Sequence, residues 1–209
     1  SAGRAARRIT ARALCRQCRP RGFPGAWARI GLAHTTLAAR DGCGMVRAAD
    51  RDLGGAGAAA RQCGAGGVET VEAELATRGG LQALMTALGD RTPDVLLANA
   101  GHGLGEAFLD QEWKDIAHVI HTNVTGTTWL LHHVGQKMRA KNAGRILVTG
   151  SIAGHIPGAF QLVYNSTKSY TAHFCSGLRN ALKATDVVAS RLPPDLPATH
   201  FFQQSLTHY

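Results

Sequence analysis

Apolar runs and helical stripes alternate along the chain from Gly67 onward. The apolar runs have the length of buried parallel strands, and the stripes between them have the i, i+3, i+4, i+7 spacing of amphipathic helices. This alternation predicts an α/β fold, a doubly wound and mostly parallel sheet with helices on both faces. The expected strands are 68–75, 94–98, 146–148 and 187–190, and the expected helical segments are 81–88, 111–141 and 164–182.

One stretch places three reactive side chains after a predicted strand. Ser151 follows the apolar run at 146–148, and Tyr164 and Lys168 stand four residues apart in the next helical pattern, on one face. A lysine cation within about 4–6 Å favours a phenolate and lowers the tyrosine pKa from its ordinary value near 10. We therefore expect Tyr164 to exchange a proton with a carbonyl or alcohol oxygen that Ser151 also holds.

These residues resemble the short-chain dehydrogenase/reductase family. The match consists of Tyr-x-x-x-Lys at Tyr164 and Lys168, Ser151 thirteen positions upstream, the triplet Asn99-Ala100-Gly101 after an apolar run, and Asn123. Their order and spacing extend the resemblance over residues of about 67–192. It implies a Rossmann-type fold and an NAD(P)-dependent oxidoreductase that interconverts a carbonyl and a secondary alcohol by hydride transfer.

The resemblance also implies a role for each matching residue. Tyr164 is the acid/base, Lys168 the cation that lowers its pKa and contacts the nicotinamide ribose, and Ser151 holds the carbonyl oxygen of the substrate. Asn123 completes the proton relay through a bound water, the alternative being a polar residue on a solvated helix face. The implied cofactor is NADP or NAD, with NADP slightly favoured, and its implied contacts are Asn99, Ala100, Gly101, Tyr164, Lys168, Glu74 (near the adenine) and Thr199.

The charge of the chain is concentrated in residues 1–66, a segment that we separate from the core predicted at 67–209. The whole chain has a net charge of +9, and the 12 Arg, no Lys and three Asp of residues 1–67 account for all of it. Three explanations stay open: a mitochondrial transit peptide, a basic nucleic-acid arm that lacks interleaved aromatic residues, or a divergent or frameshifted coding segment. The balanced remainder argues against a nucleic-acid partner.

The first third also lacks the glycine-rich phosphate turn of the family. Its nearest substitute, the G-x-G-x-x-A at 55–60, follows no apolar run, and we interpret it as a loop. We therefore expect the first strands and helices of the fold to be missing there. At the other end, ten residues follow Thr199, too few for the substrate-covering helices and last strand of the family. A second hypothesis is thus an inactive family-like fragment or binding protein.

Other classes of function have weaker support. Cys15 and Cys18 stand in a C-x-x-C without a second ligand pair, and we interpret the histidines at 118, 121, 132 and 133 as exposed, so no metal site is predicted. No apolar run approaches the length that spans a membrane. The expected partner is a small carbonyl or alcohol substrate, in a cytoplasmic (alternatively mitochondrial) protein that the resemblance implies to be a homodimer or homotetramer.

Overall fold

The computed structural model describes residues 9–14, 44–49, 62 and 67–192. Its centre is a six-stranded sheet in the order β3-β2-β1-β4-β5-β6, with every neighbouring pair parallel. The strands are β1 Ile9–Leu14, β2 Gly44–Ala49, β3 Gly67–Glu72, β4 Val95–Ala98, β5 Gly144–Thr149 and β6 Val187–Leu192. The predicted doubly wound, parallel α/β fold is confirmed.

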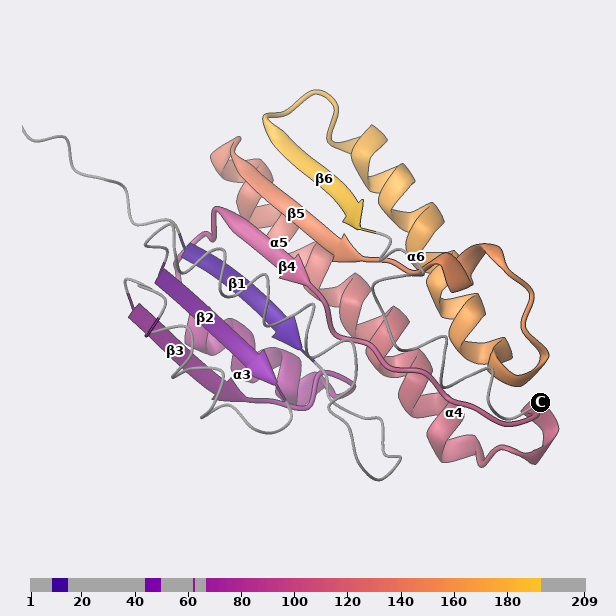
Figure 1. Ribbon diagram of the computed structural model, residues 1–209. Coiled ribbons are helices and arrows are strands. Elements are labelled where there is room, and N and C mark those ends of the chain that lie inside the picture. Colours follow the sequence, from indigo (N-terminus) through magenta and orange to yellow (C-terminus); the bar gives the residue numbers. More distant parts are fainter. Residues whose placement is uncertain (1–8, 15–43, 50–61, 63–66, 193–209) are drawn as a thin grey trace, which may run out of the picture.

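The strand order reverses between β1 and β4. From β1 the chain adds β2 and β3 on one side, and it then returns to add β4, β5 and β6 on the other. In open parallel sheets the crevice at such a switch point, outside the carboxyl ends of the strands, is where ligands bind. The topology therefore places a candidate site where β1, β4 and β5 end (Figure 1).

Two strands come from the basic first third. β1 pairs with β2 on one side and with β4 on the other. Ala13 of β1 lies opposite Ala48 of β2 and opposite Ala98 of β4. The expectation that this segment lacks the first strands of the sheet is wrong for β1 and β2. The boundary at residue 66 separates two stretches of different composition, but strands from both sides of it belong to the same sheet.

The helices form where the apolar stripes predict them. They are α3 Arg78–Leu88, α4 Trp113–Ile120, α5 Thr127–Lys141 and α6 Leu162–Ala181, with a π-helix, His121–Gly126, joining α4 to α5. Thr77 caps α3 by accepting a hydrogen bond from the Gly80 backbone N–H at 3.1 Å, and α3 ends at Gly89, whose φ of 58° suits glycine. β3 is shorter than predicted, because Thr77 N–H bonds back to the Glu74 carbonyl in a turn.

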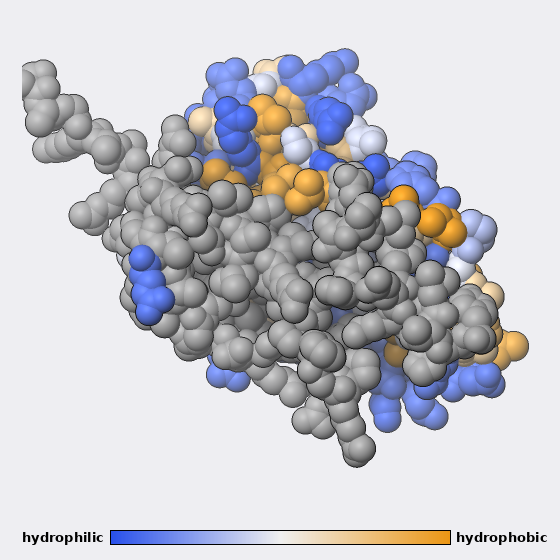
Figure 2. Space-filling model, in the orientation of Figure 1, coloured by the Kyte–Doolittle hydropathy of each residue, from blue (hydrophilic) through white to orange (hydrophobic). Residues whose placement is uncertain are grey.

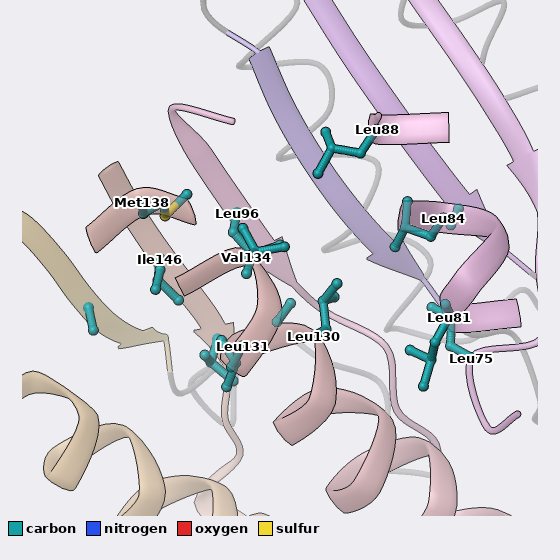
Figure 3. Close-up of a cluster of buried hydrophobic side chains, with 14 of the residues drawn as sticks. Leu75, Leu81, Leu84, Leu88, Leu96, Leu130, Leu131, Val134, Met138 and Ile146 are labelled. Atoms are coloured by element: carbon teal, nitrogen blue, oxygen red, sulfur yellow. The ribbon is translucent and has the colours of Figure 1, made fainter. Parts of the chain in front are cut away.

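The main core lies between one face of the sheet and the helices α3, α5 and α6, which all cover that face (Figure 1). Figure 3 shows Leu130, Leu131 and Val134 of α5 in the same buried cluster as Leu96 and Ile146 of the sheet. Burial of such side chains contributes about 1.5–3 kcal/mol each. Figure 2 shows an apolar surface over β5 and β6. Val188 of β6 is 47% exposed.

The helix that joins β4 to β5 changes its packing partner along its length. In α4, Ile116 and Val119 pack against Val163 of α6, whereas α5 packs its leucines on the sheet. The π-helix between them rotates the buried face from one partner to the other, as one extra residue per turn does. Within the described ranges, no helix combines the length and apolar character that a bilayer span requires.

Candidate active site

The site is built at the carboxyl ends of β4 and β5. Asn99 directly follows β4 and is 1% exposed, and its partner Thr149, the last residue of β5, is also buried. The Thr149 hydroxyl donates to Asn99 Oδ1 at 2.6 Å. This bond ties the two strand ends together, and it fixes the start of the loop that carries Ala100 and Gly101.

Lys168 reaches into this edge from the first turns of α6. Its ammonium donates to the Thr149 backbone carbonyl at 3.1 Å and lies 5.8 Å from the centre of the Tyr164 ring. The side chain is buried, and the loss of hydration lowers the pKa of Lys168 from 10.5 to about 8. Tyr164 itself is fully buried. The helical spacing has thus brought the phenol and the cation together inside the protein.

Ser151 is held against the same helix. Its Oγ accepts from the Ala153 backbone N–H at 3.1 Å and caps the 3₁₀ turn Ile152–His155, while Ala153 packs on Tyr164. Gly154 allows this close approach, since a Cβ there would lie 2.7 Å from the Lys168 carbonyl carbon. The strand end and the helix therefore present Ser151, Tyr164 and Lys168 from one tightly packed junction.

Asn123 occupies the π-helix and is 2% exposed, so the alternative of a solvated helix face is wrong. Its Oδ1 accepts from the His102 backbone N–H at 3.0 Å, and its Nδ2 donates to the His102 carbonyl at 2.9 Å and to Thr167 Oγ1 at 3.0 Å. Thr167 in turn donates to the Tyr164 carbonyl at 2.8 Å. The asparagine side chain thus connects the loop after β4 to the helix of Tyr164; the relay water stays a prediction.

The residues at this edge fit a dinucleotide cofactor. A Cβ on Gly101 would lie 3.1 Å from Asn123 Oδ1 and 3.4 Å from Lys168 Nζ, so a side chain here would crowd the asparagine beside the lysine. The donors gathered here, a hydroxyl, a phenol and an ammonium, suit the hydroxyls of a ribose and a carbonyl oxygen. Asn99, Ala100, Gly101 and Lys168 would hold the nicotinamide end.

One predicted cofactor contact, Glu74, lies apart from this group. Glu74 belongs to the turn after β3, where its Oε1 accepts from the Ala76 N–H at 3.0 Å and its Oε2 lies 3.5 Å from His118 Nε2. Its carboxylate is thus engaged within the protein, and its adenine contact stays a prediction. Thr199 and the glycine pattern at 55–60 lie outside the described residues.

Several residues of the site were not predicted from the sequence. Thr149 lies two residues before Ser151, and Thr167 lies directly before Lys168. The only signal for Thr167 was its place three residues after Tyr164, from which a threonine hydroxyl in a helix can donate to the tyrosine carbonyl. His118 was expected to be exposed; instead it is partly buried and its Nδ1 lies 2.7 Å from His102 Nε2. Within residues 67–192 and the two earlier strands, no three His, Cys, Asp or Glu side chains converge as metal ligands.

The fold and this junction define a class of protein. The family model "short chain dehydrogenase" matches residues 24–208, and the chain belongs to that family. It is 33% identical over 114 residues to serine 3-dehydrogenase of Agrobacterium fabrum, covering 54% of this chain and 45% of that protein. It is 38% identical over 109 residues to NADP-dependent 3-hydroxy acid dehydrogenase of Schizosaccharomyces pombe, covering 52% and 42%.

A solved structure supports the fold. Serine dehydrogenase from Escherichia coli superimposes with a TM-score of 0.72 at 25% identity, covering 89% of this chain and 82% of the other. The matches to the two curated relatives above cover less than half the length of each of those proteins. The resemblance inferred from four short motifs is therefore confirmed at the level of family and fold.

Proposed function

We propose that this chain is an NAD(P)-dependent oxidoreductase that interconverts a carbonyl and a secondary alcohol. The observation that carries the proposal is the buried junction in which Lys168 donates to Thr149 O at 3.1 Å and lies 5.8 Å from the Tyr164 ring. When bound, the cofactor accepts the hydride from the alcohol carbon or returns it to the carbonyl carbon. Every other part of the chemistry belongs to side chains of this chain.

Proton transfer is assigned to Tyr164. In the reduction direction its hydroxyl gives a proton to the substrate oxygen as negative charge develops there, and in oxidation it takes the proton back. The Lys168 ammonium stabilises the phenolate that remains, and burial strengthens this interaction by excluding water. The Ser151 hydroxyl donates to the same substrate oxygen and fixes its position. Asn123 holds the loop after β4 against α6 through its hydrogen bonds to His102 and Thr167.

The names of the relatives support a choice of cofactor and of a first substrate class. We favour NADP over NAD, since the S. pombe relative is named an NADP-dependent enzyme. A polar hydroxy acid is the first substrate class to examine, because two of the relatives described above are named for a 3-hydroxy acid or serine. The expected partner is thus a small molecule, and a homodimer or homotetramer is the expected assembly.

The test measures NADPH formation or consumption by absorbance with 3-hydroxy acids, serine and simple ketones. Tyr164→Phe should reduce turnover by about 10²–10⁴-fold, because it removes only the proton that is transferred. Tyr170→Phe is the matched control: this tyrosine lies on the same helix, 39% exposed, with its hydroxyl 2.9 Å from Thr128 Oγ1. Equal turnover in Tyr164→Phe and wild type would remove Tyr164 from the mechanism.

A further inference from the structure

Two loops leave the carboxyl edge of the sheet and meet beside the start of α6. The first loop (residues 99–112, after β4) contains the 3₁₀ turn Phe108–Asp110, and the second loop (residues 150–161, after β5) contains the 3₁₀ turn Ala159–Gln161. The two turns are in contact, at the end of the molecule where α4 and α6 begin (Figure 1). The second turn leads directly into α6, which carries Tyr164 in its first turn. The two loops therefore flank the side from which a substrate reaches Tyr164.

Both loops are anchored on the neighbours of Tyr164 in the chain. Leu104 of the first loop packs in one apolar cluster with Val163. The Asn165 side chain donates from Nδ2 to the Ile156 carbonyl of the second loop at 2.7 Å. The residues directly before and after Tyr164 thus each hold one loop, so the position of both loops relative to the phenol is set by packing and hydrogen bonding.

The tip of the first loop is preformed as well. Gln111 Nε2 donates to the carbonyls of Gly105 at 2.9 Å and of Glu106 at 3.0 Å. Glu106 has a φ of 84°, a conformation that a residue other than glycine keeps where its surroundings hold it. Phe108 follows two residues later in the 3₁₀ turn. A ligand that binds against this tip has little loop ordering to oppose it.

Large apolar side chains stand where the two loops meet. The first loop contributes Phe108 and Leu109, which are 40% and 90% exposed, and Phe160 and Leu162 beside the second turn are 50% and 45% exposed. We call these four residues the apolar rim. Exposed apolar side chains gathered at one place mark ligand sites more often than scattered ones do, and ligand sites are lined mainly by apolar and aromatic groups. The rim borders the candidate active site, since Phe160 stands four residues before Tyr164.

The charges of the two loops oppose an anion at the rim. The second loop contains no Asp, Glu, Lys or Arg. The first loop contains no Lys or Arg, and its charged residues are all acids, Glu106, Asp110 and Glu112. Arg191 of β6 reaches the second loop at His155, where its Nη1 lies 3.1 Å from His155 Nε2. A carboxylate at the rim would lose hydration against apolar groups and face these acids, without a cation from either loop.

We propose that the apolar rim binds an alkyl chain or aromatic ring that the substrate carries on its reacting carbon. The inference rests on the function proposed above and specifies which substituent this site selects. Phe108 and Phe160 are specificity-determining residues, and neither takes part in proton transfer. Among the compounds named above, 3-hydroxy acids with a long 3-alkyl chain and ketones with such a chain meet this requirement. Serine does not, because its hydroxyl-bearing carbon carries no such group.

The experiment measures kcat and KM from NADPH absorbance for the methyl ketones from 2-butanone to 2-octanone. Each added CH₂ group should raise kcat/KM by about 2- to 4-fold, the range that partial to full burial of the group gives. The compound 7-oxooctanoate has the length of 2-octanone but ends in a carboxylate. It should be reduced about 10-fold or more less efficiently than 2-octanone, because its charged end would lose hydration at the rim.

Phe160→Ala should lower kcat/KM for 2-octanone by about 5- to 10-fold, mainly through KM, and change the value for 2-butanone less than about 2-fold. Phe160→Leu should keep most of the preference, because the side chain stays large and apolar. Val188→Ala is the matched control, since Val188 is 47% exposed on β6 and should leave the ketone series unchanged. Phe108→Ala, from the other loop, should show the same selective loss and decides the matter where Phe160→Ala does not fold.

The outcomes separate the rim from the proposed function. Equal kcat/KM along the ketone series, equal use of 7-oxooctanoate and 2-octanone, or an unchanged chain-length preference in the folded alanine variants would overturn the role of the rim alone. Turnover of any ketone would leave the proposed function in place. No change in NADPH with any ketone, 3-hydroxy acid or serine would overturn the proposed function and with it the role of the rim.

Discussion

Thr167→Val gives a direct test of the link between Asn123 and the helix of Tyr164. The threonine hydroxyl is buried, accepts from Asn123 Nδ2 at 3.0 Å and donates to the Tyr164 carbonyl at 2.8 Å. Valine keeps the shape of the side chain and replaces the hydroxyl with a methyl group. The substitution therefore leaves one N–H of Asn123 without an acceptor, while its other N–H still reaches the His102 carbonyl.

The expected loss of stability follows from this count. One buried donor without a partner costs about 1–3 kcal/mol. The Tyr164 carbonyl adds little to that figure, since α6 supplies its regular backbone bond. In a chain of 209 residues such a loss lowers the melting temperature by about 2–10 °C.

Urea unfolding followed by tryptophan fluorescence measures the change, with Thr167→Ser as the control. Serine keeps the hydroxyl and removes a methyl group, so it should lose about 1 kcal/mol or less. A Thr167→Val protein within 0.5 kcal/mol of wild type, on the order of the experimental error, would refute the link as described.

Two further predictions concern the same junction. Burial lowers the pKa of Lys168 from 10.5 to about 8, so the unfolded chain binds more protons above pH 7 and the free energy of unfolding should rise by about 1–2 kcal/mol from pH 7 to pH 9. Lys168→Met should remove this rise in urea titrations, and an unchanged slope would contradict it. Gly154→Ala should cost about 1–3 kcal/mol and lower turnover by displacing Ser151, because its Cβ would meet the backbone of α6 at 2.7 Å. Gly177→Ala, on the same helix with nothing within 4 Å, should be neutral or stabilising, and equal effects of the two alanines on turnover would argue against crowding.

The sequence alone predicted the second half of the fold well. The strands β4, β5 and β6 and the helices α3 and α6 carry strong apolar patterns, and their ends differ from the prediction by a few residues at most. β1 and β2 were missed because Ile-Thr-Ala-Arg-Ala-Leu and Gly-Met-Val-Arg-Ala-Ala are short and rich in alanine, a residue that does not favour strands. Pairing with neighbours on both sides, which no local pattern reveals, defines β1 as a strand.

The candidate site, like the fold, could be predicted from the sequence only in part. Tyr164, Lys168 and Ser151 could be placed from spacing, since four residues on a helix and the end of a strand fix their positions. The pairing of His102 with His118 could not, because it depends on how α4 packs beside the loop after β4, sixteen residues away in sequence. Contacts between segments are set by tertiary packing, and a single sequence contains no periodic signal for them.

The π-helix His121–Gly126 has a consequence for how this region tolerates change. Substitutions alter one contact at a time, but deleting a single residue here would restore α-helical winding and turn α5 by about 100° relative to α4. Leu130 and Leu131 would leave the sheet, and Asn123 would leave Thr167, in one step. The segment is therefore strict in length, so insertions and deletions accepted by ordinary helices should be lethal to folding here.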